Sequence, residues 1–263
     1  MPEKLYKKKH LTSFQLIILG VAGVILLGTF LLMLPVSSLE RVPTPFHEAL
    51  FTATSAVCVT GLVVKDTGSY WSLTGQTIIL VLIQIGGLGV VTVAASVSLL
   101  SGKKISLMQR STMQDAISAP KVGGIVRLTR FILKGTLLIE TVGAMLLLPV
   151  FLSDYGLKGV WMAVFHSVSA FCNAGFDILG TATHTFSSLM RYSGSILVNV
   201  VIMLLIIIGG IGFLTWDDIY MNKMNFKRYR MQSKIILMTT AGLILIPTVF
   251  FFVCDLKNLS AGK

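Results

Sequence analysis

Charged residues are scarce in this chain. Only 13% of its 263 residues are charged, whereas soluble domains usually carry about 25%. Hydrophobic residues make up 54% of the sequence, and the mean hydropathy is +0.83. Several apolar runs reach the length of about 20 residues that a helix needs to cross a bilayer. The composition therefore predicts an integral membrane protein.

Cysteines and catalytic motifs are sparse as well. The three cysteines, Cys58, Cys172 and Cys254, show no metal-ligand spacing, which argues against a zinc site and favours small buried residues. The sequence has no HExxH motif, no phosphate-binding loop and no diagnostic spacing of histidine and nucleophile. We therefore expect no enzymatic activity and no bound cofactor.

Acidic residues are half as frequent as basic ones. The sequence has 11 acidic and 22 basic residues, which give a net charge of +11. In a soluble protein this balance would suggest nucleic-acid binding. Here the basic residues gather in the N-terminal tail and in segments 103–130 and 223–234, between apolar runs. The positive-inside rule places these segments in the cytoplasm. The N-terminus is thus predicted to be cytoplasmic, with no role for nucleic acid.

The apolar runs fall into two length classes. Five are long enough to span the membrane: residues 14–34, 74–100, 131–152, 195–215 and 235–253. Two are too short, residues 45–57 and 159–171, and the charge pattern places both on the outer side. A short helix that begins and ends outside must dip into the membrane and return. The pattern predicts an all-α membrane protein with two re-entrant pore helices.

An internal repeat relates the two halves of the sequence. Residues 55–62 read Ser-Ala-Val-Cys-Val-Thr-Gly-Leu, and residues 169–176 read Ser-Ala-Phe-Cys-Asn-Ala-Gly-Phe. Each follows a short helix, and each precedes a span with a Gly-Gly-x-Gly sequence. We therefore predict repeated span–pore helix–span units around a pore, two repeats plus the first span of a third. The predicted parts are a tail (1–13), a first repeat (14–100), a basic linker (101–130), a second repeat (131–216), a second basic linker (217–234) and the incomplete third repeat (235–263).

The segments after the short helices are candidates for an ion-selectivity filter. Backbone carbonyls at membrane depth are tolerated only where they line a water-filled path or bind a cation, and a ring of neutral carbonyls can replace the hydration shell of a monovalent cation. A glycine there permits backbone dihedrals closed to other residues, although a single glycine after a helix is often only a cap. The predicted filter residues are Val59, Thr60, Gly61, Asn173, Ala174 and Gly175.

Other polar and glycine positions inside the spans leave alternatives open. The glycines Gly86, Gly87, Gly89, Gly209, Gly210 and Gly212 could allow close helix packing or a bend that gates the pore. Glu140 lies inside a span, where a carboxylate either pairs with a polar group or attracts cations. We interpret Gln84 and Asn199 as contacts between helices, Asp217 and Asp218 as solvated, and His47 and His166 as surface or packing residues.

These residues together resemble the Trk/Ktr/HKT superfamily of potassium transporters. The resemblance rests on the two repeat segments and on Gln-Ile-Gly-Gly-Leu-Gly at residues 84–89. It covers nearly the whole chain and is closest to the KtrB branch, the membrane subunits of bacterial Ktr systems. It implies four repeats around one pore, a filter glycine in each, here Gly61 and Gly175, and K⁺ as the transported ion, often with Na⁺ dependence. It also implies a multi-pass protein of the bacterial plasma membrane, a homodimer and a KtrA-like cytosolic ring of nucleotide-binding gating subunits.

The number of repeats departs from this pattern. Two repeats and one further span place the C-terminus of this chain outside, and we expect the sequence to be part of a longer protein. A non-transporting fragment or scaffold subunit is the main alternative. A coupled secondary transporter would need inverted repeats, whereas both repeats here run in the same direction. An intramembrane enzyme lacks reactive pairs in the sequence.

Overall fold

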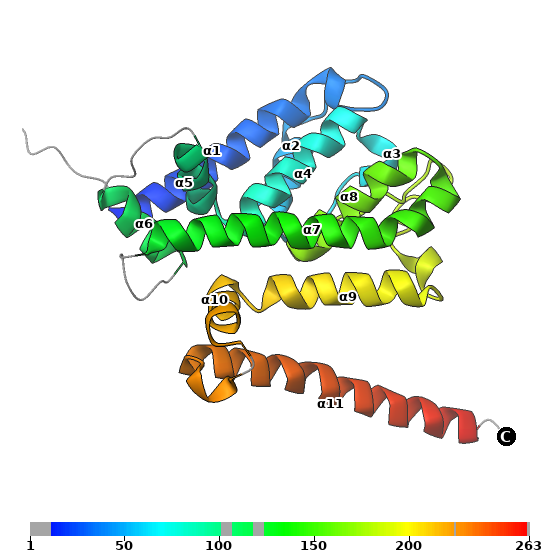
Figure 1. The fold of residues 1–263 in the computed structure, drawn as a ribbon. Helices are drawn as coiled ribbons and strands as arrows, with labels where there is room; N and C mark the ends of the chain where they lie inside the picture. The colour runs from blue at the N-terminus through cyan, green and yellow to red at the C-terminus, as the bar shows by residue number, and fades with distance from the viewer. Residues whose placement is uncertain (1–11, 101–106, 118–123, 224, 262–263) are drawn as a thin grey trace, which may run out of the picture. The chain divides into compact units, whose positions relative to one another are not determined.

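The computed structural model describes residues 12–100, 107–117, 124–223 and 225–261. Within these ranges the regular structure is helical, apart from one isolated bridge between Ser38 and Trp71. The all-α class is therefore confirmed. Figure 1 follows the helices from α1 at the N-terminal end to α11 at the C-terminal end.

Three of the predicted spans are single long helices. They are α1 (Ser13–Met33), α7 (Ile125–Tyr155) and α11 (Met231–Ala261), and each is apolar and long enough to cross a membrane. Thr12 precedes α1, and its hydroxyl accepts a hydrogen bond from Gln15 N while the Gln15 side chain accepts from Thr12 N. This capping box satisfies two backbone donors at the start of the span. The long apolar helices thus make the chain a multi-pass membrane protein.

The other two predicted spans are interrupted. Residues 74–100 form α4 (Leu73–Leu88) and α5 (Val90–Leu100), and residues 195–215 form α9 (Ile196–Gly210) and the start of α10 (Phe213–Asn222). Each break coincides with the last glycine of a Gly-Gly-x-Gly sequence, Gly89 with φ 82° and Gly212 with φ 83°. Side chains disfavour this left-handed region, so glycine permits the break. The two predicted spans are thus broken at glycines for which the sequence left close packing or a bend open.

The two short helices lie where the sequence predicted them. They are α2 (Phe46–Val57) and α8 (Lys158–Phe171), and both end in a turn followed by non-helical chain. The basic segment 101–130 contains the helix α6 (Leu107–Ile117) and the first turns of α7. Short helical turns complete the described chain: η1 (Pro35–Ser37), α3 (Thr67–Tyr70), η2 (Met190–Tyr192) and η3 (Phe226–Arg228).

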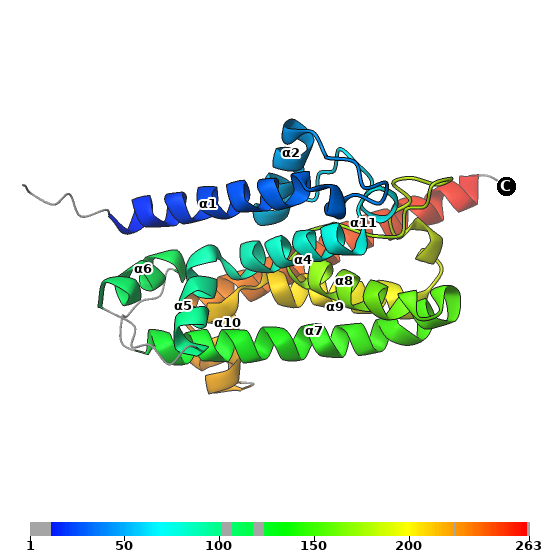
Figure 2. The ribbon, with the colours of Figure 1, turned by 90° about the horizontal axis from the view of Figure 1, so that it is seen from above.

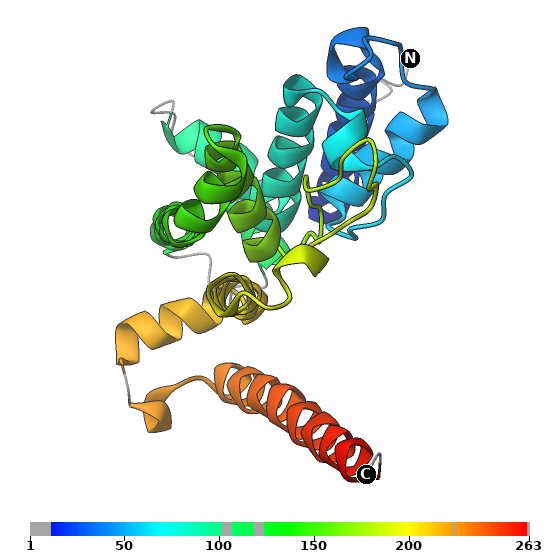
Figure 3. The same cartoon turned by 90° about the vertical axis from the view of Figure 1, so that its right-hand side faces the viewer.

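The chain divides into two compact units, residues 1–206 and 207–263. In the first unit α1 packs against α2, α4, α5 and α6, while α8 packs along α7 and also contacts α4 (Figures 2 and 3). Small residues bring these helices close: a Cβ added to Gly28 on α1 would lie 2.7 Å from Leu82 on α4. Such close approach is typical of helix packing in membranes.

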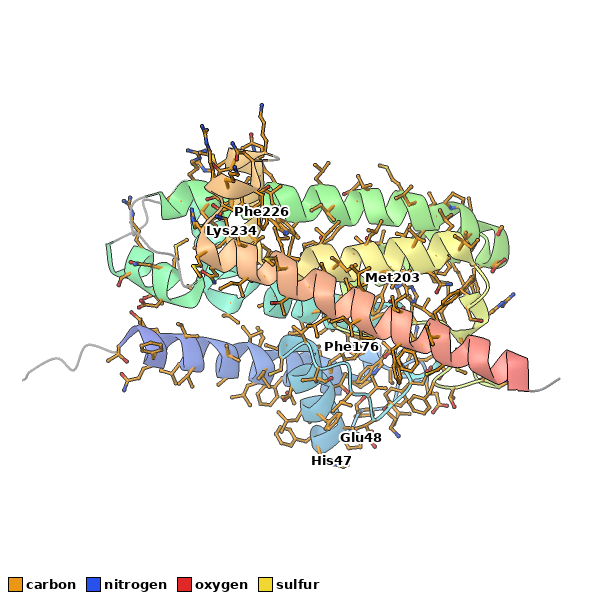
Figure 4. The ribbon with its side chains drawn as sticks, turned by 90° about the horizontal axis from the view of Figure 1, so that it is seen from below. His47, Glu48, Phe176, Met203, Phe226 and Lys234 are labelled. Carbon is orange, nitrogen blue, oxygen red and sulfur yellow. The ribbon has the colours of Figure 1, made fainter. Side chains whose placement is uncertain are left out.

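The second unit joins α10 to α11 through a tight polar turn. The Asp218 side chain is only 5% exposed, and it accepts hydrogen bonds from Arg230 N at 2.9 Å and from the Ser233 hydroxyl at 2.6 Å. Arg230 Nε lies 3.3 Å from Asp218, and its Nη2 lies 3.2 Å from Asp217. Asp218 is therefore not solvated, contrary to the prediction, because its carboxylate accepts from the residue before α11 and from a hydroxyl in the first turn of α11. In the same turn Lys234 lies over the ring of Phe226 (Figure 4).

Candidate functional site

The chain after α2 turns sharply and then changes the sign of φ from residue to residue. Cys58 N donates to Thr54 O at 2.8 Å, and Thr60 N reaches back to Ser55 O at 2.9 Å. Val59 has φ 56° and Gly61 has φ 75°. A β-branched residue with positive φ is strained unless its surroundings hold it there. This first segment is therefore a defined structure and not a simple glycine cap.

The chain after α8 repeats the same pattern. Cys172 N donates to Val168 O at 2.9 Å, and Ala174 N donates to Ser169 O at 2.8 Å. Asn173 has φ 58° and Gly175 has φ 70°. The backbone hydrogen bonds and the positive φ angles thus fall at matching positions of the two aligned sequences. The side-chain hydrogen bonds differ. The Thr60 hydroxyl donates to the Ser55 hydroxyl at 2.9 Å, whereas the Ser169 hydroxyl donates to Phe176 O at 2.6 Å.

The two segments meet at their glycines. A Cβ added to Gly61 would lie 2.6 Å from Ala174 O, and a Cβ added to Gly175 would lie 3.7 Å from the Cα of Gly61. All six predicted filter residues lie on these two segments, and the structure brings Gly61, Ala174 and Gly175 together. Residues far apart in the sequence thus form one backbone-rich surface.

The glycines of α4 serve two different purposes. A Cβ on Gly86 would overlap Val57 O at the end of α2, and a Cβ on Gly87 would lie 2.5 Å from the Cys172 sulfur at the end of α8. Gly89, by contrast, has open space around it and breaks the helix. Close packing therefore applies to Gly86 and Gly87 and a helix break to Gly89, while a gating role stays a prediction. In the second repeat Gly209 and Gly210 end α9, and Gly212 marks the break.

Glu140 joins three elements of the site. It is 6% exposed, its Oε1 accepts a hydrogen bond from Gln84 Nε2 at 2.9 Å, and its backbone oxygen accepts from the Ser167 hydroxyl at 2.7 Å. The Cys172 thiol in turn lies 4.0 Å from Gln84 Oε1. Because Gln84 links α4 to α7, the interpretation of this residue as a contact between helices is confirmed. A structural partner for Glu140 is present, while attraction of cations stays a prediction.

Other side chains singled out in the sequence play local parts. Asn199 donates to the backbone oxygens of Tyr192, Ser193 and Ser195, so it fixes the start of α9 and does not join two helices. His47 is exposed at the first turn of α2, where its neighbour Glu48 pairs with Lys65 at 3.3 Å (Figure 4). Cys172 is buried as expected, but Cys58 is exposed, contrary to the expectation for the cysteines.

Two aspartates outside the predicted site connect the loops that follow the two segments. Asp66 accepts from Ser69 N at 2.7 Å and, across a long stretch of sequence, from Phe186 N at 2.8 Å. Asp177 accepts from Leu179 N at 3.1 Å. Burial, together with the charge of Asp66, raises the pKa of the Asp177 carboxyl above its usual value, while the Leu179 bond opposes the shift. Sequence reasoning missed both, although Asp177 follows the second repeat segment by one residue.

Comparison with known proteins supports a transport protein. The TrkH family, described as "Cation transport protein", matches residues 3–254. The chain is 38% identical over 97% of its length to "Potassium/sodium uptake protein NtpJ" of Enterococcus hirae and, again over 97%, to "Ktr system potassium uptake protein B" of Bacillus subtilis. It is 35% identical over 93% to the protein of the latter name in Vibrio alginolyticus.

Coverage of these relatives is partial. The chain spans 55%, 56% and 52% of their lengths, respectively. The match to the family description nevertheless extends over almost the whole of this chain. The Ktr branch identified by the repeat segments is likewise the branch of two of these relatives. The chain is a member of the TrkH family of cation transport proteins.

Proposed function

We propose that this chain supplies part of the pore of a potassium uptake system, with backbone carbonyls of the two segments as part of the selectivity filter. The observation that carries the proposal is the shared geometry of the segments, which meet at Gly61 and Gly175. Two chemically different sequences, Val-Thr-Gly and Asn-Ala-Gly, hold one backbone pattern. A site that conserves backbone geometry while its side chains vary is suited to binding through carbonyls.

The alternating φ angles support this reading of the chemistry. In an ordinary strand successive carbonyls point to opposite sides. When the sign of φ alternates, as at Val59 and Gly61 and again at Asn173 and Gly175, successive carbonyls can turn toward one side. Neutral oxygens aligned in this way suit a monovalent cation that has shed its water.

The ends of the short helices add a second favourable feature. The C-terminus of a helix carries a partial negative charge. The close contacts of Gly86 with Val57 and of Gly87 with Cys172 place the C-terminal ends of α2 and α8 at one stretch of α4. Both ends can thus lower the energy of a cation below the filter. Beyond Gly89 the helix changes direction, which makes the Gly-Gly-x-Gly breaks candidates for the gate.

The wider assembly is proposed on the family pattern. Further repeats complete the pore, the membrane subunit is a homodimer, and a KtrA-like cytosolic ring of nucleotide-binding subunits gates it. The Ktr system names of the relatives support a multi-component system. Na⁺ is proposed as a coupling or activating ion, and the name of the Enterococcus relative, a potassium/sodium uptake protein, supports a role for Na⁺. We place the protein in the bacterial plasma membrane, with the N-terminus inside and Lys263 outside.

Growth rescue tests the proposed function. The chain is expressed in bacteria without their own potassium uptake systems, both alone and joined after residue 254 to the second half of the Bacillus subtilis relative, each with that relative's gating partner. We expect the joined protein to restore growth on limiting potassium. Membrane insertion is verified for both forms by immunoblot of isolated membranes.

The outcomes separate the proposal from its main alternative. Rescue by the joined protein that is lost on Gly61→Ser substitution supports a filter in this chain. Rescue that survives Gly61→Ser removes Gly61 from the filter. A well-inserted joined protein that does not rescue growth contradicts the proposal and favours a scaffold subunit.

A further inference from the structure

A partly open cavity with several polar residues in a mainly apolar lining lies beside the second filter segment. It has a volume of about 240 Å³ and is bounded by α8, α9 and the chain around Gly175. Its polar lining residues are His166, Ser169, Asn173, Asp177 and Ser188. One water molecule occupies about 30 Å³ in the liquid, so the cavity has room for several.

His166 lines this cavity and carries a buried acceptor without a partner among the described residues. Its side chain is 2% exposed, and its Nδ1 lies 2.7 Å from Met162 O. A carbonyl can only accept, so Nδ1 carries the proton, and in the neutral ring Nε2 is left as an acceptor. Among the described residues Nε2 has no hydrogen-bond partner. Buried polar atoms in native proteins almost always have one, from protein or from ordered water.

The neighbouring polar groups do not provide the missing donor. Ser169 already donates its hydroxyl proton to Phe176 O at 2.6 Å, which leaves it as an acceptor. The Asn173 amide donates to Phe171 O at 3.4 Å, and its oxygen can only accept. An ionised Asp177 is an acceptor as well. The second N–H of Asn173 and the Ser188 hydroxyl are the remaining side-chain donors in the lining, and neither of them is hydrogen-bonded to His166 Nε2. A cavity rich in acceptors calls for a small molecule that donates.

The first repeat has no equivalent cavity chemistry. The positions that correspond to His166, Asn173 and Asp177 are occupied by Thr52, Val59 and Val63. Thr52 donates its hydroxyl proton to Glu48 O at 2.9 Å within its own helix. The polar lining is therefore not a consequence of the shared repeat.

We propose that this cavity is an ordered-water site that braces the second filter segment. Water donates to His166 Nε2 on the pore helix and, directly or through further waters, to the Asp177 carboxylate after the filter. The bridge holds residues 173–177 at a fixed distance from α8 and so fixes the direction of their carbonyls. The selectivity consequence rests on the proposed function, whereas the water site itself does not.

A structure of the assembled transporter, at a resolution that shows ordered water, tests the site directly. We expect density about 3 Å from His166 Nε2, at hydrogen-bond distance. His166→Phe, which keeps an aromatic ring, removes this density, and His166→Gln, which offers an amide oxygen at a similar place, keeps it. An empty cavity overturns the proposal. So does density that gains an anomalous signal when potassium is replaced by rubidium, because it marks a cation site.

Ion uptake by reconstituted transporter tests the bracing. His166→Phe and Asp177→Val each lower the ratio of K⁺ to Na⁺ uptake about five-fold, the size expected for one lost hydrogen bond. Because both act through the same water, the double variant is no worse than either single variant. Thr52→Val, the matched change in the first repeat, leaves the ratio unchanged. Independent losses in the double variant, or an equal loss for Thr52→Val, contradict the bracing.

Failure of the two proposals can be told apart. If the unchanged transporter carries no potassium although it is folded and inserted, the proposed function fails. The density near His166 then still decides whether the water site exists. If potassium uptake is selective and the His166→Phe protein elutes as a folded dimer with unchanged selectivity, only the bracing role fails.

Discussion

The backbone oxygen of Ala174 faces Gly61 so closely that a Cβ at position 61 would come within 2.6 Å of it. Real Cβ atoms essentially never approach another atom this closely. The two proposed filter segments are therefore in contact through backbone, and at Gly61 the contact leaves no space for any side chain. Gly175, on the opposite side of the same contact, has more room, since its added Cβ would lie 3.7 Å from the nearest atom.

This asymmetry predicts different costs for the same substitution. Gly61→Ala is destabilised both by the overlap with Ala174 and by the left-handed backbone. Gly175→Ala is destabilised only by the left-handed backbone, which costs about 1–2 kcal/mol. We expect Gly61→Ala to lower the thermal unfolding temperature of the purified protein clearly more than Gly175→Ala. Equal shifts for the two variants would show that the segments do not touch as described.

The hydrogen bond between Gln84 and Glu140 predicts a coupled pair. Glu140→Leu leaves the Gln84 amide unpaired in the membrane and should destabilise the protein by about 1 kcal/mol, the range measured for side-chain hydrogen bonds between membrane helices. Glu140→Gln keeps an acceptor and should cost less. Adding Gln84→Leu to Glu140→Leu should cause little further loss of stability. Unfolding of the purified variants in detergent measures these differences. Fully additive effects would mean that the two side chains act separately.

The α4 glycines predict a separation of folding from transport. Gly87→Ala forces α4 away from Cys172, because the new Cβ would lie 2.5 Å from its sulfur, and we expect less folded protein in the membrane. Gly89→Ala meets only Thr92 Oγ1 at 3.9 Å, and its cost is confined to the left-handed backbone at the break. We therefore expect Gly89→Ala to fold and to change the maximal uptake rate. A folded Gly87→Ala protein with normal yield would argue against close packing at the pore-helix end.

The turn between α10 and α11 predicts unequal roles for adjacent aspartates. Asp218→Ala removes a buried acceptor of two hydrogen bonds and should cost about 1–3 kcal/mol. Asp217→Ala removes a more exposed partner of Arg230, and exposed ion pairs contribute roughly 0–1 kcal/mol. Proteolysis of the 207–263 region in purified protein provides the comparison. Greater protease sensitivity for Asp217→Ala than for Asp218→Ala would reverse the assignment.

Short-range features of this protein could be predicted from its sequence. The helices α2 and α8 were located to within about one residue, because apolar runs too short to cross and poor in basic residues have few other structures in a membrane. For Gly89 and Gly212 the sequence left close packing and a bend open, since hydropathy continues through both breaks and records nothing of φ. Gly86 could not be distinguished from Gly89, because packing depends on which neighbour reaches the glycine.

Contacts between distant segments could not be predicted. Asp218 was interpreted as solvated because its partners Arg230 and Ser233 approach only when the turn after α10 closes. The bond from Phe186 N to Asp66 joins the loops that follow the two segments and leaves no periodic signal in either. The two matching segments could be recognised because a repeat supplies two independent copies of one pattern, while their role as a filter stays a prediction. The cavity beside Gly175 is lined by side chains that the repeat does not share, and it was missed.

The most direct test of the filter is the K⁺ to Na⁺ uptake ratio of the assembled transporter carrying Gly175→Ala, measured in liposomes. Gly194→Ala is the matched control, because Gly194 also has open space but no positive φ. If the carbonyls near Gly175 select the ion, Gly175→Ala lowers the ratio several-fold while Gly194→Ala leaves it unchanged. A folded Gly175→Ala protein that keeps the full preference for potassium would contradict a filter at this position.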